Sequence, residues 1–440
     1  MRSRYVWQVL LAMAGFTVLA AVIAFTTGVA DCSSQQAVLG AAAAPSGALP
    51  QLQQETESLE RLLPRLADRG AALFLLAHHY ARLGDMKKAL TLLEECAALE
   101  EGFSPERTRA FAPLQNDPEF RNLIDQAQRR YPPVHRASVA FTLPDQDLFP
   151  EGLAVDSEER LFYMGSMHRK KIVKITESGE VSDFVKQGAA DLMPVGGVHV
   201  DADHSVWAAT DPGEKDRSEL VHFDAHGKLL ERYTAPGTGS RDLNDLVLRG
   251  GEIYTTDTSA NLVYRFDRKS HTFATLGFSR PVFLPNGITL SGDQNLLYVA
   301  DYLGVLVVDL RTNTSQDVVP DAHDTLSGID GLYWYKGDLI GVQYGTGPFR
   351  VMRWHLAKEG RSVASSEVLE RGTDLVKDPT TGAIFEGKFY FMANTGIDNL
   401  NDDKILDEQK LEPLHIAVVA LEESSEQNKK KPNPHRRPAK

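Results

Sequence analysis

Four residues that recur at one phase of an internal repeat carry side-chain oxygen atoms: Glu151, Asn244, Asn286 and Asp330. Each comes just before an apolar run typical of a buried strand, where amide and carboxylate groups are costly without a partner. A bound metal would explain them, because hard cations take oxygen ligands of this kind. Mixed donors with open positions favour Ca²⁺ over Mg²⁺, and the set lacks the His and Cys ligands of Zn²⁺. The alternative is that these side chains hydrogen-bond the strand ends and plug a channel.

The two carboxylates of this set, Glu151 and Asp330, balance the charge of one divalent cation. A cation with open positions polarises a carbonyl or phosphoryl oxygen and stabilises the developing oxyanion. Either carboxylate could activate water or attack the substrate directly. Asp301, at the end of the second strand of the Asn286 repeat, is a third catalytic candidate, as a base or as support, with a turn cap as the alternative. These residues therefore predict metal-assisted hydrolysis at a carbonyl or phosphoryl group.

The repeat that carries these residues has six copies, each with an apolar strand, a turn and a second strand. The copies contain FPEGLAVD (Glu151), PVGGVHVD (Gly196), DLNDLVLR (Asn244), LPNGITLS (Asn286), SGIDGLYW (Asp330) and PTTGAIFE (Thr381). These positions are 45, 48, 42, 44 and 51 residues apart, close to one four-stranded propeller blade. We therefore expect a mainly β fold, a six-bladed β-propeller whose inner strands gather these positions around a channel. A propeller must close its ring, so segment 136–144 should pair beside segment 416–421.

Several of these segments also resemble a known family. FPEGLAVD, LNDLVL, LPNGITLS with LYVADY, and GIDGLYW are similar to the metal-site motifs of the senescence marker protein/gluconolactonase/luciferin-regenerating-enzyme-like family. That family is related to paraoxonases and diisopropylfluorophosphatases, and the resemblance covers about 140–420. It implies a six-bladed propeller with a divalent ion held by Glu151, Asn244, Asn286 and Asp330, and the hydrolysis of a lactone or related ester beside that ion. In some members the equivalent of Asn244 also contacts substrate.

The chain departs from the family pattern beside Asn244. Regucalcin-like members have an arginine two residues earlier, whereas this chain has Asp242 there and Arg241 one residue before it. The sugar-lactone pocket of those members is therefore not implied. Paraoxonases use a channel histidine, and His199 and His168 lie near the corresponding strand ends, although hydrogen-bonded packing is the alternative for both. Asn244, His199 and Arg241 are the substrate-binding candidates.

The composition restricts the partners of this protein. A net charge of −13 argues against nucleic acid, and two cysteines cannot form a disulfide framework or a thiolate metal site. We expect a small-molecule substrate and a Ca²⁺ cofactor. Two alternatives to the lactonase remain: a strictosidine-synthase-like propeller, against which the four-ligand set argues, and a non-catalytic binding propeller.

The N-terminal segment predicts export. In residues 1–30, Arg2 and Arg4 precede an apolar run to about Ala24, which favours a membrane anchor, with a cleaved signal peptide as the alternative. In either case the remaining chain lies on the periplasmic or extracellular side, membrane-anchored or exported. Residues 31–50 are small and polar, as in a linker.

Residues 51–132 have a helical pattern and are expected to form a small domain before the propeller. The segment AHHYARLGDMKKALTLLEECAAL resembles one tetratricopeptide repeat, and Asn116-Asp117-Pro118 predicts the start of a further helix. This domain is either a protein-docking module or a spacer. The propeller is expected over 135–422, followed by a basic, Pro-rich and disordered tail over 423–440.

Overall fold

The computed structural model describes residues 49–212, 217–322, 324–401 and 404–422. The predicted anchor or signal peptide (1–30), nearly all of the linker (31–50) and the basic tail (423–440) lie outside the described residues. Within the described part of the chain, no helix combines the length and the apolar character that a membrane crossing requires.

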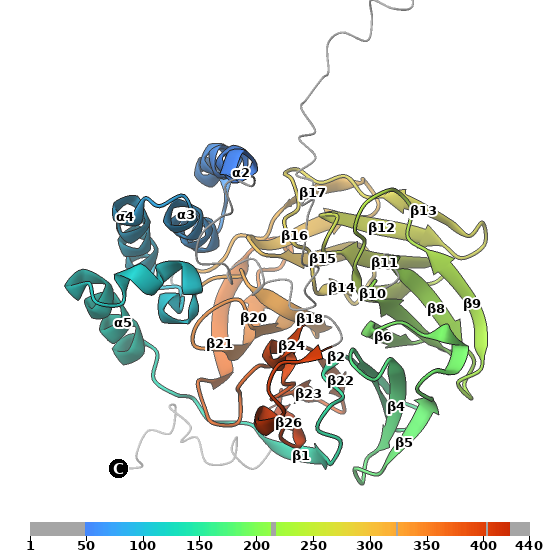
Figure 1. Ribbon diagram of the computed structural model, residues 1–440. Helices are drawn as coiled ribbons and strands as arrows, with labels where there is room; N and C mark the ends of the chain where they lie inside the picture. The colour runs from blue at the N-terminus through green and yellow to red at the C-terminus, as the bar shows by residue number, and fades with distance from the viewer. Residues whose placement is uncertain (1–48, 213–216, 323, 402–403, 423–440) are drawn as a thin grey trace, which may run out of the picture.

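Six antiparallel sheets of four strands surround a central channel (Figure 1). Blade 1 contains β2 (Pro150–Asp156), β3 (Leu161–Ser166), β4 (Lys171–Thr176) and β5 (Val181–Val185), and blade 2 contains β6 (Val195–Val200), β7 (Val206–Thr210), β8 (Glu219–Phe223) and β9 (Leu229–Thr234). Blade 3 contains β10 (Leu243–Arg249), β11 (Glu252–Asp257), β12 (Leu262–Asp267) and β13 (Thr272–Thr275), and blade 4 contains β14 (Ile288–Leu290), β15 (Leu296–Asp301), β16 (Gly304–Asp309) and β17 (Thr314–Asp317). Blade 5 contains β18 (Ile329–Tyr335), β19 (Asp338–Gln343), β20 (Arg350–Leu356) and β21 (Val363–Arg371), and blade 6 contains β22 (Gly382–Phe385), β23 (Lys388–Met392), β26 (Leu414–Ala420) and β1 (Ser138–Leu143). The six-bladed propeller predicted from the repeat is confirmed.

The ring closes through the two ends of the propeller sequence. In blade 6 the strand order is β22-β23-β26-β1, so the first strand of the propeller is the outermost strand of its last blade. Strands β1 and β26 pair antiparallel, with Ser138 opposite Val418 and Leu143 opposite Leu414. The expected pairing of segments 136–144 and 416–421 is therefore confirmed.

The hydrophobic core lies between neighbouring blades. One cluster joins Tyr163 of blade 1 to Val221 of blade 2, and another joins Val247 of blade 3 to Val299 of blade 4. Inner strands such as β2 are buried over nearly their whole length, whereas outer strands such as β9 are largely exposed. This difference explains why the apolar runs that begin each repeat are the most continuous part of the sequence pattern.

A helical region, residues 49–130, precedes the propeller. It contains α2 (Leu49–Leu62), α3 (Gly70–Arg82), α4 (Met86–Ala98) and α5 (Pro118–Arg130), with the short 3₁₀ helices η2 (Leu63–Arg65), η3 (Pro105–Arg107) and η4 (Arg109–Leu114). No strand is assigned within these residues, all of which are described. Asp117 caps α5 and accepts hydrogen bonds from the backbone N–H groups of Glu119 and Phe120, as predicted. The likeness of α3 and α4 to a tetratricopeptide pair stays a prediction.

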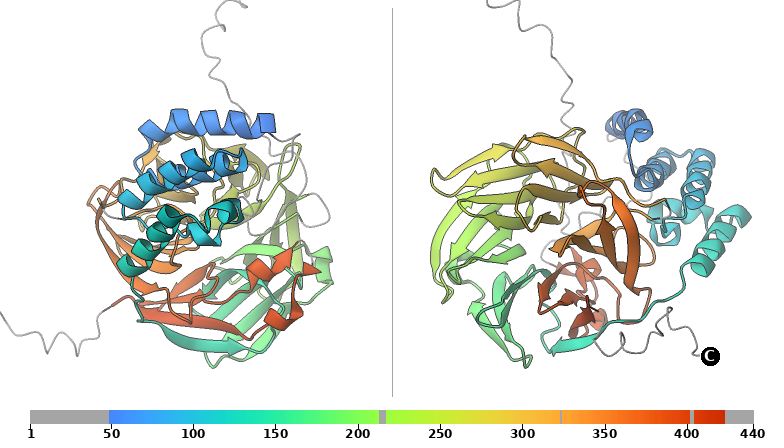
Figure 2. Two further views of the ribbon diagram at one scale, coloured as in Figure 1. Left: turned by 60° about the vertical axis from the view of Figure 1, so that its left-hand side comes forward. Right: turned by 180° about the vertical axis from the view of Figure 1, so that it is seen from behind.

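The helical region packs against one side of the propeller (Figures 1 and 2). Its core cluster includes Leu284, Tyr302 and Leu303, which belong to the connections of blade 4. Arg350 of blade 5 donates a hydrogen bond to the carbonyl oxygen of Glu101 at 2.9 Å. The remaining elements are short and lie in connections of the propeller: η5 (Ala189–Asp191), η7 (Ile397–Asn399), β24 (Leu400–Asn401), β25 (Lys404–Ile405) and η8 (Glu408–Lys410).

Candidate metal site in the propeller channel

The four predicted ligands lie at the inner edges of four different blades. Glu151 belongs to β2, Asn244 to β10 and Asp330 to β18, while Asn286 lies two residues before β14. All four residues are buried. The start of each inner strand therefore brings one polar side chain to the same level of the channel.

Side-chain bonds to the backbone connect the inner strands around this level. Thr381 Oγ1 of blade 6 donates to the carbonyl oxygen of Glu151 in blade 1. Thr256 Oγ1 of blade 3 donates to the carbonyl oxygen of Asn286 at the entrance to blade 4, at 2.8 Å. These bonds fix the backbone at the ligands and leave their side chains free to face one another.

The residue after each repeat position is glycine in five of the six copies. A Cβ on Gly152 would lie 2.2 Å from the carbonyl oxygen of Gly196, and one on Gly287 would lie 2.4 Å from that of Asp330. Neighbouring inner strands approach so closely here that only glycine fits. Asp245, which follows Asn244, is the exception.

Three oxygen atoms in this part of the channel are buried without a hydrogen-bond partner: Glu151 Oε2, Asn286 Oδ1 and Asp330 Oδ1. The amide of Asn286 donates a hydrogen bond to the Asp330 carboxylate, so these two side chains are in direct contact. Buried oxygen atoms without a donor are costly, and a cation that accepts their lone pairs removes that cost. The donors fit a hard divalent cation.

The raised pKa values of Glu151 and Asp330 also favour a bound cation at this site. Burial raises the pKa of Glu151 well above its usual range, and the nearby carboxylates, first Asp330, raise it further. Burial also raises the pKa of Asp330 to about 7, although the hydrogen bond from Asn286 lowers it. Such groups resist ionisation unless a positive charge lies beside them, and a bound divalent cation supplies that charge.

Within the described residues, no three His, Cys, Asp or Glu side chains form a cluster that could hold a metal. The predicted set contains only two residues of these types, Glu151 and Asp330, and its other members are the amides of Asn244 and Asn286. Carboxylate, amide and water oxygens together are typical of Ca²⁺ coordination, in which six to eight oxygen atoms surround the ion.

A cavity of about 180 Å³ extends from this level along the channel. Glu151, Asn244 and Thr381 contribute to its polar part, and mainly apolar side chains of the inner strands form the rest of its wall. His199 and Asp245 also line it, whereas the other two predicted ligands do not. A small polar head group and an apolar body would both find suitable surroundings here.

The structure places Asp301 outside this cavity. Its carboxylate forms a two-fold ion pair with Arg280, at 2.5 and 3.0 Å, and accepts backbone hydrogen bonds from Phe283 and Leu303, each at 3.0 Å. Asp301 is fully buried in this arrangement. Its contacts are those of a turn cap that fixes two connections of blade 4, and they leave no oxygen directed at the channel cavity.

Arg241 is likewise engaged away from the cavity. Its guanidinium donates to the carbonyl oxygens of Pro236 at 2.8 Å and Ser240 at 2.9 Å, and its Nε lies 3.8 Å from Asp257 Oδ2. Arg241 therefore supports the connection that leads into β10. Arg241 is close to Asn244 in the sequence, but it does not line the channel cavity.

The two histidines differ. His199 lines the channel cavity, and burial lowers its pKa to about 4, so the ring is neutral at neutral pH. His168 lies beside the carbonyl oxygen of Asp147, with Nδ1 at 3.0 Å, and its ring packs edge-on against Phe149. Of the two, only His199 is placed where a neutral hydrogen-bonding group could touch a bound molecule.

Two carboxyl groups beside Asn244, buried Asp242 and half-buried Asp245, were not singled out as site residues by the sequence. Asp245 lines the cavity, and burial raises its pKa to about 7, although hydrogen bonds from the backbone N–H groups of Leu246 and Ile288 lower it. Burial, Asp211 and Asp257 raise the pKa of Asp242. The signal for Asp245 was present in the sequence, since it stands where the other five copies have glycine.

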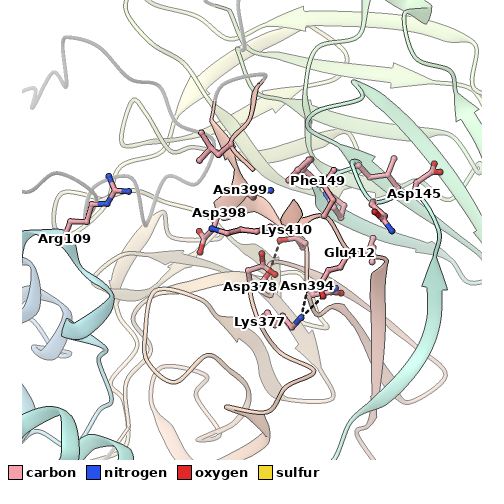
Figure 3. Close-up of a pocket in the computed structure, with 18 residues that line it drawn as sticks. Arg109, Asp145, Phe149, Lys377, Asp378, Asn394, Asp398, Asn399, Lys410 and Glu412 are labelled. Atoms are coloured by element: carbon pink, nitrogen blue, oxygen red, sulfur yellow. Dashed lines mark hydrogen bonds and ion pairs between the residues drawn. The ribbon is translucent and has the colours of Figure 1, made fainter. Parts of the chain in front are cut away.

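A second cavity, of about 310 Å³, lies beside blades 1 and 6 (Figure 3). The segment before β2, the connection after β23 and Arg109 of the helical region line it. Lys377 and Glu412 form an ion pair at 2.7 Å in its wall, and Arg109 lies apart from the other labelled side chains (Figure 3). The lining includes Pro150, the residue before Glu151, but none of the four predicted ligands.

Comparison with known sequences gives no assignment. No protein-family model matches this chain, and no curated protein sequence matches it.

Several solved structures are similar to the chain at low sequence identity. An aldose sugar dehydrogenase from Streptomyces coelicolor is 14% identical, and the similarity covers 66% of this chain and 99% of that one, with a TM-score of 0.46. A gluconolactonase from Xanthomonas campestris is 17% identical, with 66% and 95% covered and a TM-score of 0.44. Regucalcin, a calcium-binding protein from Agrobacterium tumefaciens, is 18% identical, with 64% and 95% covered and a TM-score of 0.45. Similarity at this level assigns no function to this chain.

Proposed function

We propose that this protein binds one divalent cation, with Ca²⁺ the best match, between Glu151, Asn244, Asn286 and Asp330, and hydrolyses a lactone or related ester beside it. The observation that carries the proposal is the set of three buried oxygen atoms without hydrogen-bond partners, which come from three different blades. Structural hydrogen bonding at strand ends, the alternative explanation of these residues, would leave such atoms satisfied.

The four side chains would have different roles because two are charged and two are neutral. Glu151 and Asp330 would retain the ion, because their two negative charges neutralise it in a buried site. Asn244 and Asn286 would add neutral oxygen ligands, and Asn244, which also lines the cavity, would contact the substrate. Removing an amide therefore leaves the charge balance intact, whereas removing a carboxylate does not.

A divalent cation bound here would polarise the substrate carbonyl and stabilise negative charge on its oxygen. Glu151 or Asp330 would accept a proton from the attacking water or attack the carbonyl carbon itself. His199, neutral and in the cavity wall, would orient the substrate through a hydrogen bond. The apolar wall of the channel would exclude bulk water from the ester.

The second cavity of about 310 Å³ would hold the larger part of the substrate. Its volume lies in the range of small-molecule sites, and its lining includes Pro150, the neighbour of Glu151 in the sequence. Because its wall contains both charged and apolar side chains, the substrate would carry polar substituents.

The test combines binding and turnover on the full-length chain. Calorimetry with CaCl₂ should detect one site, and a panel of lactones, esters and phosphotriesters should show hydrolysis that EDTA abolishes and Ca²⁺ restores. Absence of binding by Ca²⁺ and by other divalent cations would refute the metal site. Binding of Ca²⁺ without turnover of any compound in the panel would favour the non-catalytic binding propeller.

A further inference from the structure

The helical region contacts the two connections that lead into Asn286 and Asp330. Both ligands follow loops between blades: Asn286 precedes β14, and Asp330 is the second residue of β18. A loop positions a ligand only as well as the loop itself is held. Some of the contacts that hold these two loops come from outside the propeller, from the helical region.

Asp68, in the connection between α2 and α3, holds the loop before Asp330. Its Oδ2 accepts hydrogen bonds from Thr325 Oγ1 at 2.6 Å and from the backbone N–H of Leu326 at 2.8 Å. Asp68, Thr325 and Leu326 are all buried. A buried charged acceptor with two donors is a strong constraint, so the backbone four residues before Asp330 is fixed by the helical region.

A second chain of hydrogen bonds holds the same loop from the other side. Gln343 donates to the carbonyl oxygens of Thr325 at 3.0 Å and Ser327 at 2.8 Å. Arg350 donates to the side-chain oxygen of Gln343 and also to the carbonyl oxygen of Glu101 at 2.9 Å. The loop is thus joined to the helical region directly through Asp68 and indirectly through Gln343 and Arg350.

The loop before Asn286 is held by packing. Leu284, two residues before the ligand, is buried in the same hydrophobic cluster as α3 and α4. Its backbone N–H donates to Asn261 Oδ1 at 2.7 Å, and its φ of 48° is one that a leucine rarely adopts. The surrounding contacts must maintain this conformation, and the helical region supplies part of them.

We propose that the helical region is a structural part of the metal site, with Asp68 as the positioning residue for Asp330. This inference rests on the proposed function, because it concerns the ligands of the proposed cation. It replaces both earlier interpretations of the region, spacer and docking module, with a third. Linkage then requires reciprocity: the contact through Asp68 strengthens Ca²⁺ binding, and bound Ca²⁺ strengthens the contact.

Calorimetry with CaCl₂ on the full-length Asp68→Ala variant tests whether the contact through Asp68 strengthens Ca²⁺ binding. We expect Ca²⁺ affinity to fall by at least about 5-fold, the lower end of coupling between two sites. Asp117→Ala is the matched control, because Asp117 also accepts two hydrogen bonds, but both are within the helical region. It should leave Ca²⁺ affinity unchanged. Asp68→Asn, which keeps one acceptor oxygen, should recover part of the affinity.

Hydrogen exchange tests whether bound Ca²⁺ strengthens the contact between Asp68 and the loop before Asp330. In wild type, Ca²⁺ should slow amide exchange at Leu326 and in the connection around Asp68. In Thr325→Val, the effect at Asp68 should be smaller. This variant removes the donor to Asp68 and the acceptor of the Ser327 N–H, and it leaves the residues of the helical region unaltered. This variant also keeps the test valid if Asp68→Ala does not fold.

The outcomes separate the two proposals. A wild-type chain that binds no divalent cation overturns the proposed function and with it this inference. A wild type that binds Ca²⁺, together with unchanged affinity in Asp68→Ala and Thr325→Val, overturns the positioning role alone. Equal loss in Asp117→Ala would reduce the effect to general destabilisation and would also overturn it.

Discussion

Acidic side chains are buried in two regions of this protein, and they are satisfied in different ways. At the interface between the helical region and blade 5, Asp68 accepts two hydrogen bonds, and Asp324 accepts one from Trp354 Nε1 at 2.7 Å and one from the N–H of Thr325 at 2.8 Å. In the channel, oxygen atoms of Glu151 and Asp330 have no such donor. At the interface Asp68 Oδ1 and Glu101 Oε2 also lack a hydrogen-bond donor among the described residues, so the two regions differ mainly in the positive charge that lies beside their carboxyl groups.

The interface also contains a cation and a shared proton. Arg350 Nη2 lies 3.7 Å from Asp324 Oδ1. Burial and the neighbouring Asp68 raise the pKa of Glu101, with which Asp68 shares a hydrogen bond, so one of the two carboxyls keeps its proton. Arg350 and this proton therefore offset two of the three carboxyl charges at the interface. Within the described residues, no arginine or lysine is paired with Glu151 or Asp330, and this contrast supports the proposed metal site.

The largest expected effect is the loss of cation binding in Asp330→Ala. Removing this carboxylate leaves the ion under-neutralised, so calorimetry should show Ca²⁺ affinity reduced by at least about 100-fold, more than the loss of an outer-shell partner. Glu359→Ala, an exposed carboxylate far from the channel, controls for net charge and should bind Ca²⁺ as wild type does. Retained Ca²⁺ affinity in Asp330→Ala would mean that the channel carboxylates do not hold the cation, in contradiction to the contrast drawn between the channel and the interface.

Arg350→Met tests the opposite region. It removes the internal cation and should lower the free energy of unfolding by about 3 kcal/mol, the scale of breaking a buried ion pair. Urea denaturation in saturating Ca²⁺ measures this. Arg61→Met, which removes an exposed pair with Glu57 within α2, should change it by less than about 1 kcal/mol. If both variants behave alike, the interface does not depend on its arginine.

Asn244→Ala separates ligand from substrate contact within the channel. Because an amide carries no charge, most Ca²⁺ affinity should persist while hydrolysis falls about 100-fold, the scale of one lost oxyanion contact. Glu151→Gln should weaken cation binding and turnover together. The measurement is a Ca²⁺ titration beside kcat and KM for the best lactone of the panel. Equal loss of affinity in the two variants would make Asn244 a plain ligand.

The smallest effect concerns pH. In both regions burial raises carboxyl pKa values, so the folded protein holds protons that the unfolded chain releases. The resulting stability is fully present below the ordinary carboxyl pKa of about 4 and is lost as the pH rises through the folded-state values. For Asp330 that value is about 7. Without Ca²⁺, unfolding free energy should therefore decrease by about 1 kcal/mol or more between acidic and neutral pH.

The two regions should respond differently to the cation. Saturating Ca²⁺ should remove the channel's share of this pH dependence, because the bound ion stabilises the ionised carboxylates. The interface's share should persist in Ca²⁺ and decrease in Glu101→Gln, in which the amide cannot release a proton. Denaturation curves at several pH values with Ca²⁺ or EDTA distinguish these cases. A pH dependence in Glu101→Gln identical to that of wild type in Ca²⁺ would contradict the shared proton.

The sequence by itself determined the architecture and selected the four residues proposed as ligands. A blade is one repeat, so its period, its buried inner strand and the glycine needed where blades approach all leave local patterns that can be compared between copies. The closing pair, β1 and β26, followed from the need to close a ring. The same periodicity placed Glu151, Asn244, Asn286 and Asp330 at one level, because equivalent positions in equivalent strands must meet at the channel.

The tertiary structure alone decided what lies between the repeats. Asp301 meets Arg280 and not the cavity, and Arg241 turns to loop carbonyls, because loop conformations differ from copy to copy and carry no periodic signal. The contact of Asp68 with Thr325 joins residues 257 positions apart in sequence. No local pattern encodes such a contact, since it arises only when the helical region packs against the propeller, and here that packing holds the loop before Asp330, a proposed metal ligand.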